Sequence, residues 1–195
     1  MDTFKFVVVF SCACSLLISC RQKSSTPKEV SIDLPYTFKT EKAENLSIKA
    51  FALRKETKYD EAIKLYQQAI AIEPDNPKLF FDISECYANK KELNEAIFAL
   101  DTAIKLDSLN PNFYNNRGLI YWKLYKDENA IIDYKHAIAL GSQSWVTYSN
   151  LSIVYYWNKK QIEACETFKT AKKLGLPADV ITNDKHLTVL QESCK

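Results

Sequence analysis

Glycine and proline are scarce in this sequence, with 3 and 6 residues in a chain of 195. Turn-rich β-sandwiches and barrels need many such residues, whereas helices exclude them from their interiors. The scarcity therefore favours an all-α fold, and the 47% of hydrophobic residues allows a sizeable core. The glycines are also isolated from one another, so the chain has no glycine-rich loop of the kind that holds phosphate groups.

An excess of charge of one sign is lacking as well. The 26 basic and 24 acidic side chains give a net charge of +2, and no block of like charges occurs. Proteins that bind nucleic acid usually carry a basic stripe or patch. The sequence therefore gives no electrostatic reason to expect a nucleic-acid partner.

Residues in a catalytic or metal-binding arrangement are absent too. His136 and His186 are the only histidines, and the six cysteines include no CxxC pair. Neither histidine has the spacing of a metal ligand or of the base in a nucleophilic pair. Acid pairs such as Asp60-Glu61 precede predicted helices, where negative charge complements the helix dipole. We expect no enzyme activity, no metal and no cofactor.

The N-terminus has an apolar run that is too short to span a membrane. It extends from Phe6 to Ile18, whereas a spanning helix needs about 20 residues. A charged start at Lys5 and small residues after the run predict a secretory signal peptide over residues 1–19. Residues 17–20, Leu-Ile-Ser-Cys, resemble the bacterial lipoprotein box, in which Cys20 becomes the acylated first residue. The alternative is an ordinary cleaved signal followed by a chance cysteine.

The next segment, residues 20–42, is interpreted as the lipidated cysteine and a flexible tether. It contains two prolines, many hydroxyl side chains and no sustained period. A short edge strand over residues 30–34 is the competing interpretation. Arg21 follows the cysteine where inner-membrane lipoproteins have aspartate, so we expect an envelope protein on the outer membrane, facing the periplasm.

What the sequence does contain is a period of 34 residues. Small residues recur at this spacing in two series, namely Ala62, Ala96, Ala130 and Ala164, and Ala69, Ala103, Ala137 and Ala171. Large residues recur in a third series, Tyr66, Leu100, Tyr134 and Phe168. Within each unit the fixed positions follow one another in steps of three and four, which places them on one face of a helix. Each unit is therefore predicted to contain two helices.

These positions resemble the tetratricopeptide repeat family, which has the same period and the same pattern of small and aromatic residues. The closest match is the stretch 114–121, YNNRGLIY. The resemblance implies an α-solenoid of four helix-turn-helix repeats, over residues 43–76, 77–110, 111–144 and 145–178. We expect residues 179–195 to add a C-terminal capping helix, because a repeat buries its face only against a neighbour.

Two cysteines are placed close together by this arrangement. Cys165 takes the position of an isoleucine in the three preceding units, so it is expected in the core. The capping helix would pack antiparallel to the helix that contains Cys165, with Cys194 near that helix's start. We predict a Cys165–Cys194 disulfide, which export makes possible. Two reduced thiols are the alternative, and Cys86 is expected to be a buried apolar residue.

The predicted function depends on surface shape. In the family, the first helix of each repeat lines a concave groove that receives segments of other proteins. In this sequence, the residues at the corresponding repeat positions are Phe51, Phe81, Asn115, Asn116, Leu119, Trp122, Lys123, Ser149, Asn150, Ile153, Tyr156 and Trp157. Tyr155, Tyr156 and Trp157 are consecutive, so at about 100° per residue at least one must point outward.

We therefore predict a membrane-anchored adaptor that binds a peptide or segment of another envelope protein. Phe51, Asp82 and Asn112 stand where some family members have the basic and amide residues that clamp a chaperone's terminal carboxylate. The groove aromatics are equally compatible with packing between layers. Alternatives for the whole chain are a periplasmic enzyme or enzyme subunit with a site in the groove, and a structural spacer without a ligand. The oligomeric state is not predicted.

Overall fold

The computed structural model describes residues 36–195, so the predicted signal peptide, Cys20 and residues 21–35 of the predicted tether lie outside the described residues. The described part consists of α-helices without a strand, which confirms the all-α prediction. The helices are α1 Glu41–Lys55, α2 Tyr59–Ile72, α3 Pro77–Asn89, α4 Leu93–Leu106, α5 Pro111–Lys123, α6 Asp127–Ala139, α7 Trp145–Trp157, α8 Gln161–Lys173, α9 Ala178–Asn183 and α10 Lys185–Ser193. None of them is long and apolar enough to cross a membrane.

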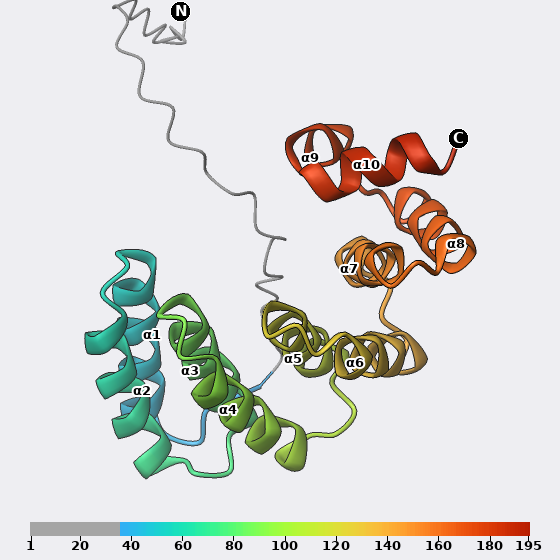
Figure 1. The fold of residues 1–195 in the computed structure, drawn as a ribbon. Coiled ribbons are helices and arrows are strands. Elements are labelled where there is room, and N and C mark those ends of the chain that lie inside the picture. The colour runs from blue at the N-terminus through green and yellow to red at the C-terminus, as the bar shows by residue number, and fades with distance from the viewer. Residues whose placement is uncertain (1–35) are drawn as a thin grey trace, which may run out of the picture.

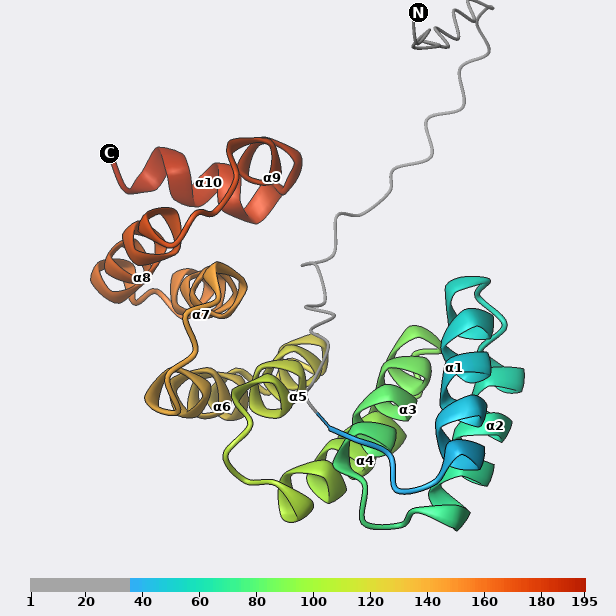
Figure 2. The ribbon, with the colours of Figure 1, turned by 180° about the vertical axis from the view of Figure 1, so that it is seen from behind.

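The first eight helices form four hairpins that stack side by side into an arc (Figures 1 and 2). In each hairpin the odd-numbered helix contacts the following even-numbered helix, and each hairpin packs on the next. The odd-numbered helices α1, α3, α5 and α7 lie on the inner side of the arc, and α2, α4, α6 and α8 on the outer side. This arrangement confirms the predicted solenoid.

The periodic residues form the contacts between the helices. Tyr66, Leu100, Tyr134 and Phe168 are fully buried, and so are the alanines of both predicted series. A Cβ atom added at Gly118 would lie 3.1 Å from Cε1 of Tyr134 and 3.3 Å from the carbonyl oxygen of Ala130. A small residue at this position lets the two helices of the hairpin approach, and the ring fills the space beside it. Cys86 is fully buried, as expected.

The hairpin turns also repeat. Thr57, Lys91, Tyr125 and Lys159 all have positive φ, near 60°, although none is glycine. Each turn has the same two backbone hydrogen bonds; in the first, Thr57 N donates to Arg54 O at 3.0 Å and Lys58 N to Leu53 O at 2.9 Å. This is the helix C-terminal motif that requires a left-handed residue. The hydrogen bonds that end the helix therefore hold these four residues in a left-handed conformation that residues other than glycine usually avoid.

The C-terminal capping segment is helical, as predicted, but residues 178–193 form two short helices in place of one. Asp184 separates them with an extended backbone, φ −109° and ψ 115°. Its carboxylate accepts hydrogen bonds from the backbone N–H groups of His186 at 2.8 Å and Leu187 at 3.2 Å. A carboxylate at this position satisfies the otherwise unpaired donors of a helix start. Asp184 therefore ends α9 and begins α10.

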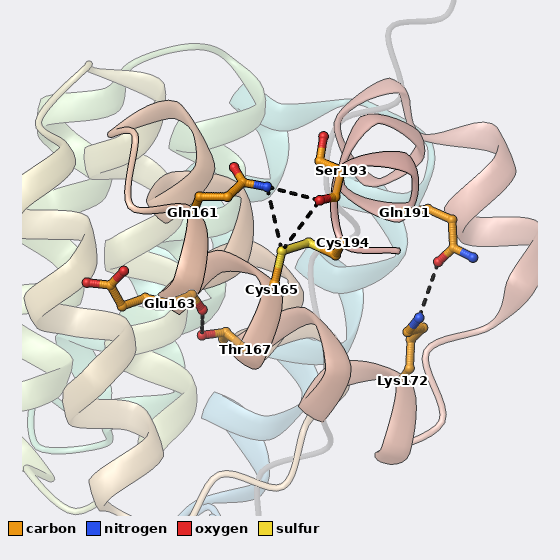
Figure 3. Close-up of a disulfide and its surroundings, with 8 residues drawn as sticks. All are labelled: Gln161, Glu163, Cys165, Thr167, Lys172, Gln191, Ser193 and Cys194. Atoms are coloured by element: carbon orange, nitrogen blue, oxygen red, sulfur yellow. Dashed lines mark hydrogen bonds between the residues drawn. A yellow bond between two sulfur atoms is a disulfide. The ribbon is translucent and has the colours of Figure 1, made fainter.

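The end of α10 returns to α8 through Cys194 (Figure 3). The Sγ atoms of Cys165 and Cys194 lie 2.02 Å apart, at the distance of a disulfide bond, with the Cα atoms 5.3 Å apart. Gln161 donates a hydrogen bond to the carbonyl oxygen of Ser193 at 3.3 Å beside them. Cys165 is only partly buried and lies at the edge of the expected core. Formation of the bond in the mature protein stays a prediction.

Candidate binding groove

The predicted groove residues all lie on the inner helices α1, α3, α5 and α7. They differ in accessibility. Trp157 is 56% exposed and Phe51 39%, while Trp122, Lys123 and Tyr156 are partly buried. The remaining members are buried: Phe81, Asn115, Asn116, Leu119, Ser149, Asn150 and Ile153. The inner face therefore combines a few accessible aromatic rings with a buried polar and apolar floor.

Three of the predicted contact residues pack inside the array. The Phe81 ring lies against Phe113 of α5, with centroids 5.5 Å apart. Leu119 and Ile153 are each only 2% exposed. An apolar side chain at this level is covered by the adjacent layer, so these three residues support the inner face and do not present a surface to a ligand.

One end of the inner face has a cavity of about 580 Å³, between α1, α3 and the extended residues before α1. Its lining consists of Tyr36, Thr37, Phe38, Glu44, Ser47, Ile48, Phe51 and Lys78. Ile48 is 59% exposed, so an apolar surface is accessible here. The register argument predicted only Phe51 among these residues. Residues 36–38 lie outside the predicted repeats, whereas the other lining residues lie within them and were missed.

Residues 36–40 are fixed to the array, although the sequence predicts a flexible tether up to residue 42. Tyr36 donates to a carboxylate oxygen of Asp107 and accepts from Asn110 Nδ2 at 3.0 Å. Burial and the bond to Asp107 raise the pKa of the Tyr36 hydroxyl to about 12, so it remains a donor at neutral pH. Thr40 donates from its backbone N–H, at 2.7 Å, and from its hydroxyl to Glu73. Single polar side chains that bond distant residues give no periodic signal.

Two asparagines on the inner face have amide atoms without a hydrogen-bond partner. Among the residues that the structure describes, neither Nδ2 nor Oδ1 of Asn150 has a partner, and Asn115 Oδ1 has none. Both side chains are almost fully buried, at 3% and 2% exposure. Asn116 differs, because its Nδ2 donates to the backbone oxygen of Asn112 at 3.1 Å. A buried polar group without a partner costs about 1–3 kcal/mol. Asn150 is as buried as Leu119 and Ile153, so a ligand would reach its amide only when the side chains that cover it move aside, and would then supply the missing hydrogen bonds.

An aromatic cluster lies at the other end of the inner face. His186 of α10 packs against Trp122, with centroids 5.6 Å apart, and against Trp157, at 5.5 Å. The Trp157 indole N–H donates to His186 Nδ1 at 3.1 Å, and Tyr156 packs edge-on against Trp157. The exposure of Trp157 confirms that the three consecutive aromatic side chains do not all pack in the core. His186 was not predicted here, because α10 lies outside the repeat register.

Burial lowers the pKa of His186 below its usual value, and Lys185 adds to this shift while Asp184 opposes it. The ring is therefore neutral at pH 7, which leaves Nδ1 free of a proton and able to accept from the Trp157 indole. Protonation would remove that acceptor. The histidine thus joins the C-terminal helix to the aromatic end of the groove.

Two pairs of charged residues lie near the cavity. Arg54 forms an ion pair with Glu85, and both side chains are nearly buried, at 9% and 3% exposure. Burial opposes the charge of Arg54, but Glu85 raises its pKa overall. Lys78 pairs with Asp82 at 2.7 Å. Residues 36–195 contain no group of three or more His, Cys, Asp or Glu placed to hold a metal ion.

Comparisons with known proteins point to the same repeat. Residues 53–115 match one model of the tetratricopeptide repeat, and residues 111–140 match a second. No curated protein sequence matches the chain.

Solved structures share the fold. A crystal structure of MamA protein has a TM-score of 0.66 at 20% identity, covering 78% of this chain and 82% of that chain. The first tetratricopeptide domain of Spaghetti (RPAP3), bound to the HSP90 peptide SRMEEVD, has a TM-score of 0.58 at 27% identity, covering 60% and 94%. The Sgt2 domain from Aspergillus fumigatus has a TM-score of 0.59 at 20% identity, covering 62% and 82%. Residues 53–140 therefore match the tetratricopeptide repeat, and the described part of the chain folds as the α-solenoid typical of that repeat.

Proposed function

We propose that this protein is a non-catalytic adaptor whose inner groove binds an extended segment of another protein. The observation that carries the proposal is the buried Asn150 amide, which has no partner among the described residues. A carboxamide both donates and accepts, so one side chain can pair with the N–H and C=O of an extended peptide. The likeness to the RPAP3 domain, which holds a peptide, supports a ligand of this kind.

Apolar side chains are accessible at both ends of the inner face, while the amides of Asn115 and Asn150 lie on α5 and α7. Ile48 and Phe51 border the cavity beside α1, and Tyr156 and Trp157 lie on α7 beside the C-terminal helices. Aromatic and aliphatic pockets near a polar centre are typical of peptide-binding surfaces. We infer that the partner segment has apolar side chains that contact the two ends of the inner face, and a backbone that pairs with the amides. Asp82 and Asn112 replace basic and amide groups of the carboxylate clamp, so the segment need not be a chain terminus.

A test of the groove replaces Asn150 by leucine, a side chain of similar shape. Unfolding of this variant in urea is expected to require about 1–3 kcal/mol more free energy than the wild type, because an unpaired buried amide has been removed. Peptides selected from a random display library against the wild type are expected to bind at least about tenfold more weakly, since the lost interactions cost at least 1.4 kcal/mol.

Asn116→Leu is the matched control for stability. Its amide donates to the backbone of Asn112, so this variant should lose stability where Asn150→Leu gains it. If Asn150→Leu is more stable but binds the selected peptides as tightly as the wild type, the amide is a packing defect and the groove proposal loses its main support.

We also propose that Cys20 anchors the adaptor in the bacterial envelope, on the outer membrane and facing the periplasm. The support is the position of Cys20 directly after the short apolar run, and Arg21 after it. Two or more acyl chains give stable anchoring, because each buried methylene contributes about 0.8 kcal/mol. Cys20→Ser should abolish fatty-acid labelling and release the protein from membranes, whereas Cys14→Ser should change neither. Labelling and membrane retention that survive in Cys20→Ser would exclude the anchor.

A further inference from the structure

The outer side of the arc has an apolar crease between α2 and α4. It is a cavity of about 380 Å³ whose floor includes Ile70, Ile83 and Ala99. Phe98 of α4 lines the same cavity and is 74% exposed. An exposed aromatic ring therefore stands beside an open apolar hollow on one face of the molecule.

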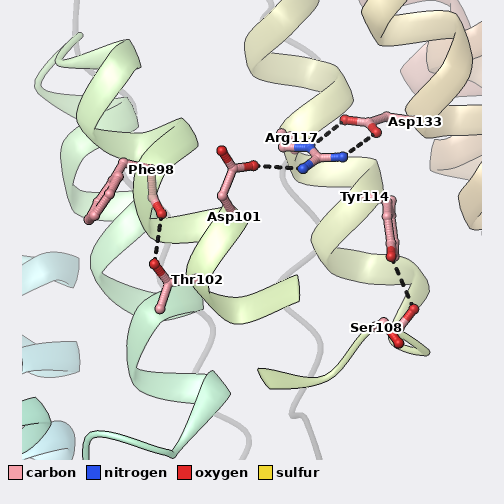
Figure 4. A network of polar contacts seen from close by, with 7 residues as sticks. All are labelled: Phe98, Asp101, Thr102, Ser108, Tyr114, Arg117 and Asp133. Carbon is pink, nitrogen blue, oxygen red and sulfur yellow. Dashed lines mark hydrogen bonds and ion pairs between the residues drawn. The ribbon is translucent and has the colours of Figure 1, made fainter. Parts of the chain in front are cut away.

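The same position in the next layer is closed. Ile83 and Ala99 are followed 34 residues later by Arg117 and Asp133, which bind each other and fill the space between the hairpins (Figure 4). Figure 4 shows Phe98 pointing away from this network. The two layers share one fold, so the open crease results from the residues chosen at this layer and not from the geometry of the repeat.

We propose that this crease is the contact of a homodimer in which Phe98 of each copy enters the crease of the other. A twofold contact uses the same patch on both subunits, so a protruding group and its receptor must lie side by side on one surface. Phe98 and the crease meet this condition. A contact between unlike proteins has no such requirement, because the protruding group and the hollow then belong to different chains.

The charges around the crease are complementary in such a pair. Glu95 of α4 is the one charged residue that lines the crease. Lys64 of α2 lies beside the crease, three residues before the lining residue Gln67. Both are exposed. When α4 of one copy lies over α2 of the other, twofold symmetry places Lys64 opposite Glu95 twice.

The area of the crease sets the extent of the contact. A stable interface buries about 800 Å² on each partner, which is more than one crease provides. Ile132 of α6 lies one period after Phe98 on the same outer side and is 64% exposed. The contact therefore extends along the outer face from α2 toward α6. Both inner grooves remain open in this dimer, which gives two binding sites per assembly and a gain in avidity for a repeated partner.

Sedimentation equilibrium of the purified full-length protein over a concentration series tests this inference. The wild type is expected to form dimers, and Phe98→Ala to raise the dimer dissociation constant at least about tenfold, the effect of losing 1.4 kcal/mol. Ile162→Ala is the control, because Ile162 is 73% exposed but lies on α8 at the far end of the arc. It should leave the dissociation constant unchanged.

A charge exchange separates self-association from other uses of the crease. Lys64→Glu and Glu95→Lys should each weaken the dimer, and the double variant should restore it, because the pairs then reform with reversed signs. These exposed substitutions leave the core intact. A wild type that stays monomeric at every concentration, equal effects of Phe98→Ala and Ile162→Ala, or a double variant weaker than both single ones would overturn the proposal. The grooves are not involved, so the result is independent of the Asn150 experiment.

Discussion

Replacing Arg117 by alanine is expected to lower the free energy of unfolding by about 3–5 kcal/mol, the cost of breaking a buried ion pair by removing one partner. Arg117 Nε and Nη2 donate to the two carboxylate oxygens of Asp133 at 2.8 and 2.7 Å. Its Nη1 donates to Asp101 at 2.6 Å, which joins α5 to α4 and α6 (Figure 4). The Asp133 side chain is only 4% exposed, so the variant would bury a carboxylate without its cation.

The stability of the Arg117→Ala variant is also expected to depend on pH. Burial already raises the pKa of Asp133, and the Arg117 guanidinium opposes that shift. Without the arginine, the pKa of Asp133 rises further in the folded state, above its unfolded value near 3.8. The folded state then binds a proton more readily than the unfolded state, so the stability deficit should shrink as the pH falls from 7 through the raised pKa. Urea unfolding at pH 7 and pH 5 measures this difference.

The preceding layer provides the matched control for Arg117. The triple variant Asp101→Gln, Arg117→Ile and Asp133→Ala reproduces Gln67, Ile83 and Ala99 of the layer before. The triple variant leaves no buried charge unpaired, which is the main cost of Arg117→Ala, although it opens a crease like that of the preceding layer. We expect the triple variant to recover most of the stability that Arg117→Ala loses. If Arg117→Ala is as stable as the wild type, the ion network contributes little to the free energy of unfolding.

Loss of the Cys165–Cys194 link is expected to lower the free energy of unfolding by about 3 kcal/mol. The two cysteines are separated by 29 residues, and closing a loop of this size restricts the unfolded chain by about that amount. The variant Cys194→Ala should lose this contribution, and reductant should destabilise the wild type without affecting the variant. Unfolding in urea, with and without reductant, compares the four conditions.

Fluorescence of Trp157 should report the same change locally, because the Trp157 indole binds His186 of α10. When the link is absent, α9 and α10 are held only by packing and single hydrogen bonds, so the signal should change at lower urea than the helical circular dichroism. If both thiols react with an alkylating reagent before any reduction, the bond does not form in the mature protein and the prediction is wrong.

The sequence was sufficient to predict the repeat because the helices of every layer pack through the same positions. Small and large residues alternate at fixed positions, as in Gly118 against Tyr134, and a period of 34 residues is readable without coordinates. The same reasoning was insufficient at the ends of the array. Tyr36 and Asp184 act through single hydrogen bonds to particular partners, and a bond of that kind leaves no periodic trace.

The register predicted which helices line the inner side of the arc, but not how accessible their side chains are. Phe81, Leu119 and Ile153 are covered by neighbouring layers, while Ile48 and His186 belong to the candidate site without having been predicted. Register tells which way a side chain points from its own helix. The exposure of that side chain depends on how closely the next helix packs against it. That distance is set by side chains in another layer.

The sequence by itself determined the all-α class, the layer period and the side of each hairpin that faces inward, because these follow from local helical spacing repeated along the chain. Only the tertiary structure decided which inner residues are buried, that the Asn150 amide lacks a partner among the described residues, and that the crease beside Phe98 is open where the next is closed by Arg117. These properties arise from contacts between residues far apart in the chain, and such contacts depend on the packed arrangement of whole helices.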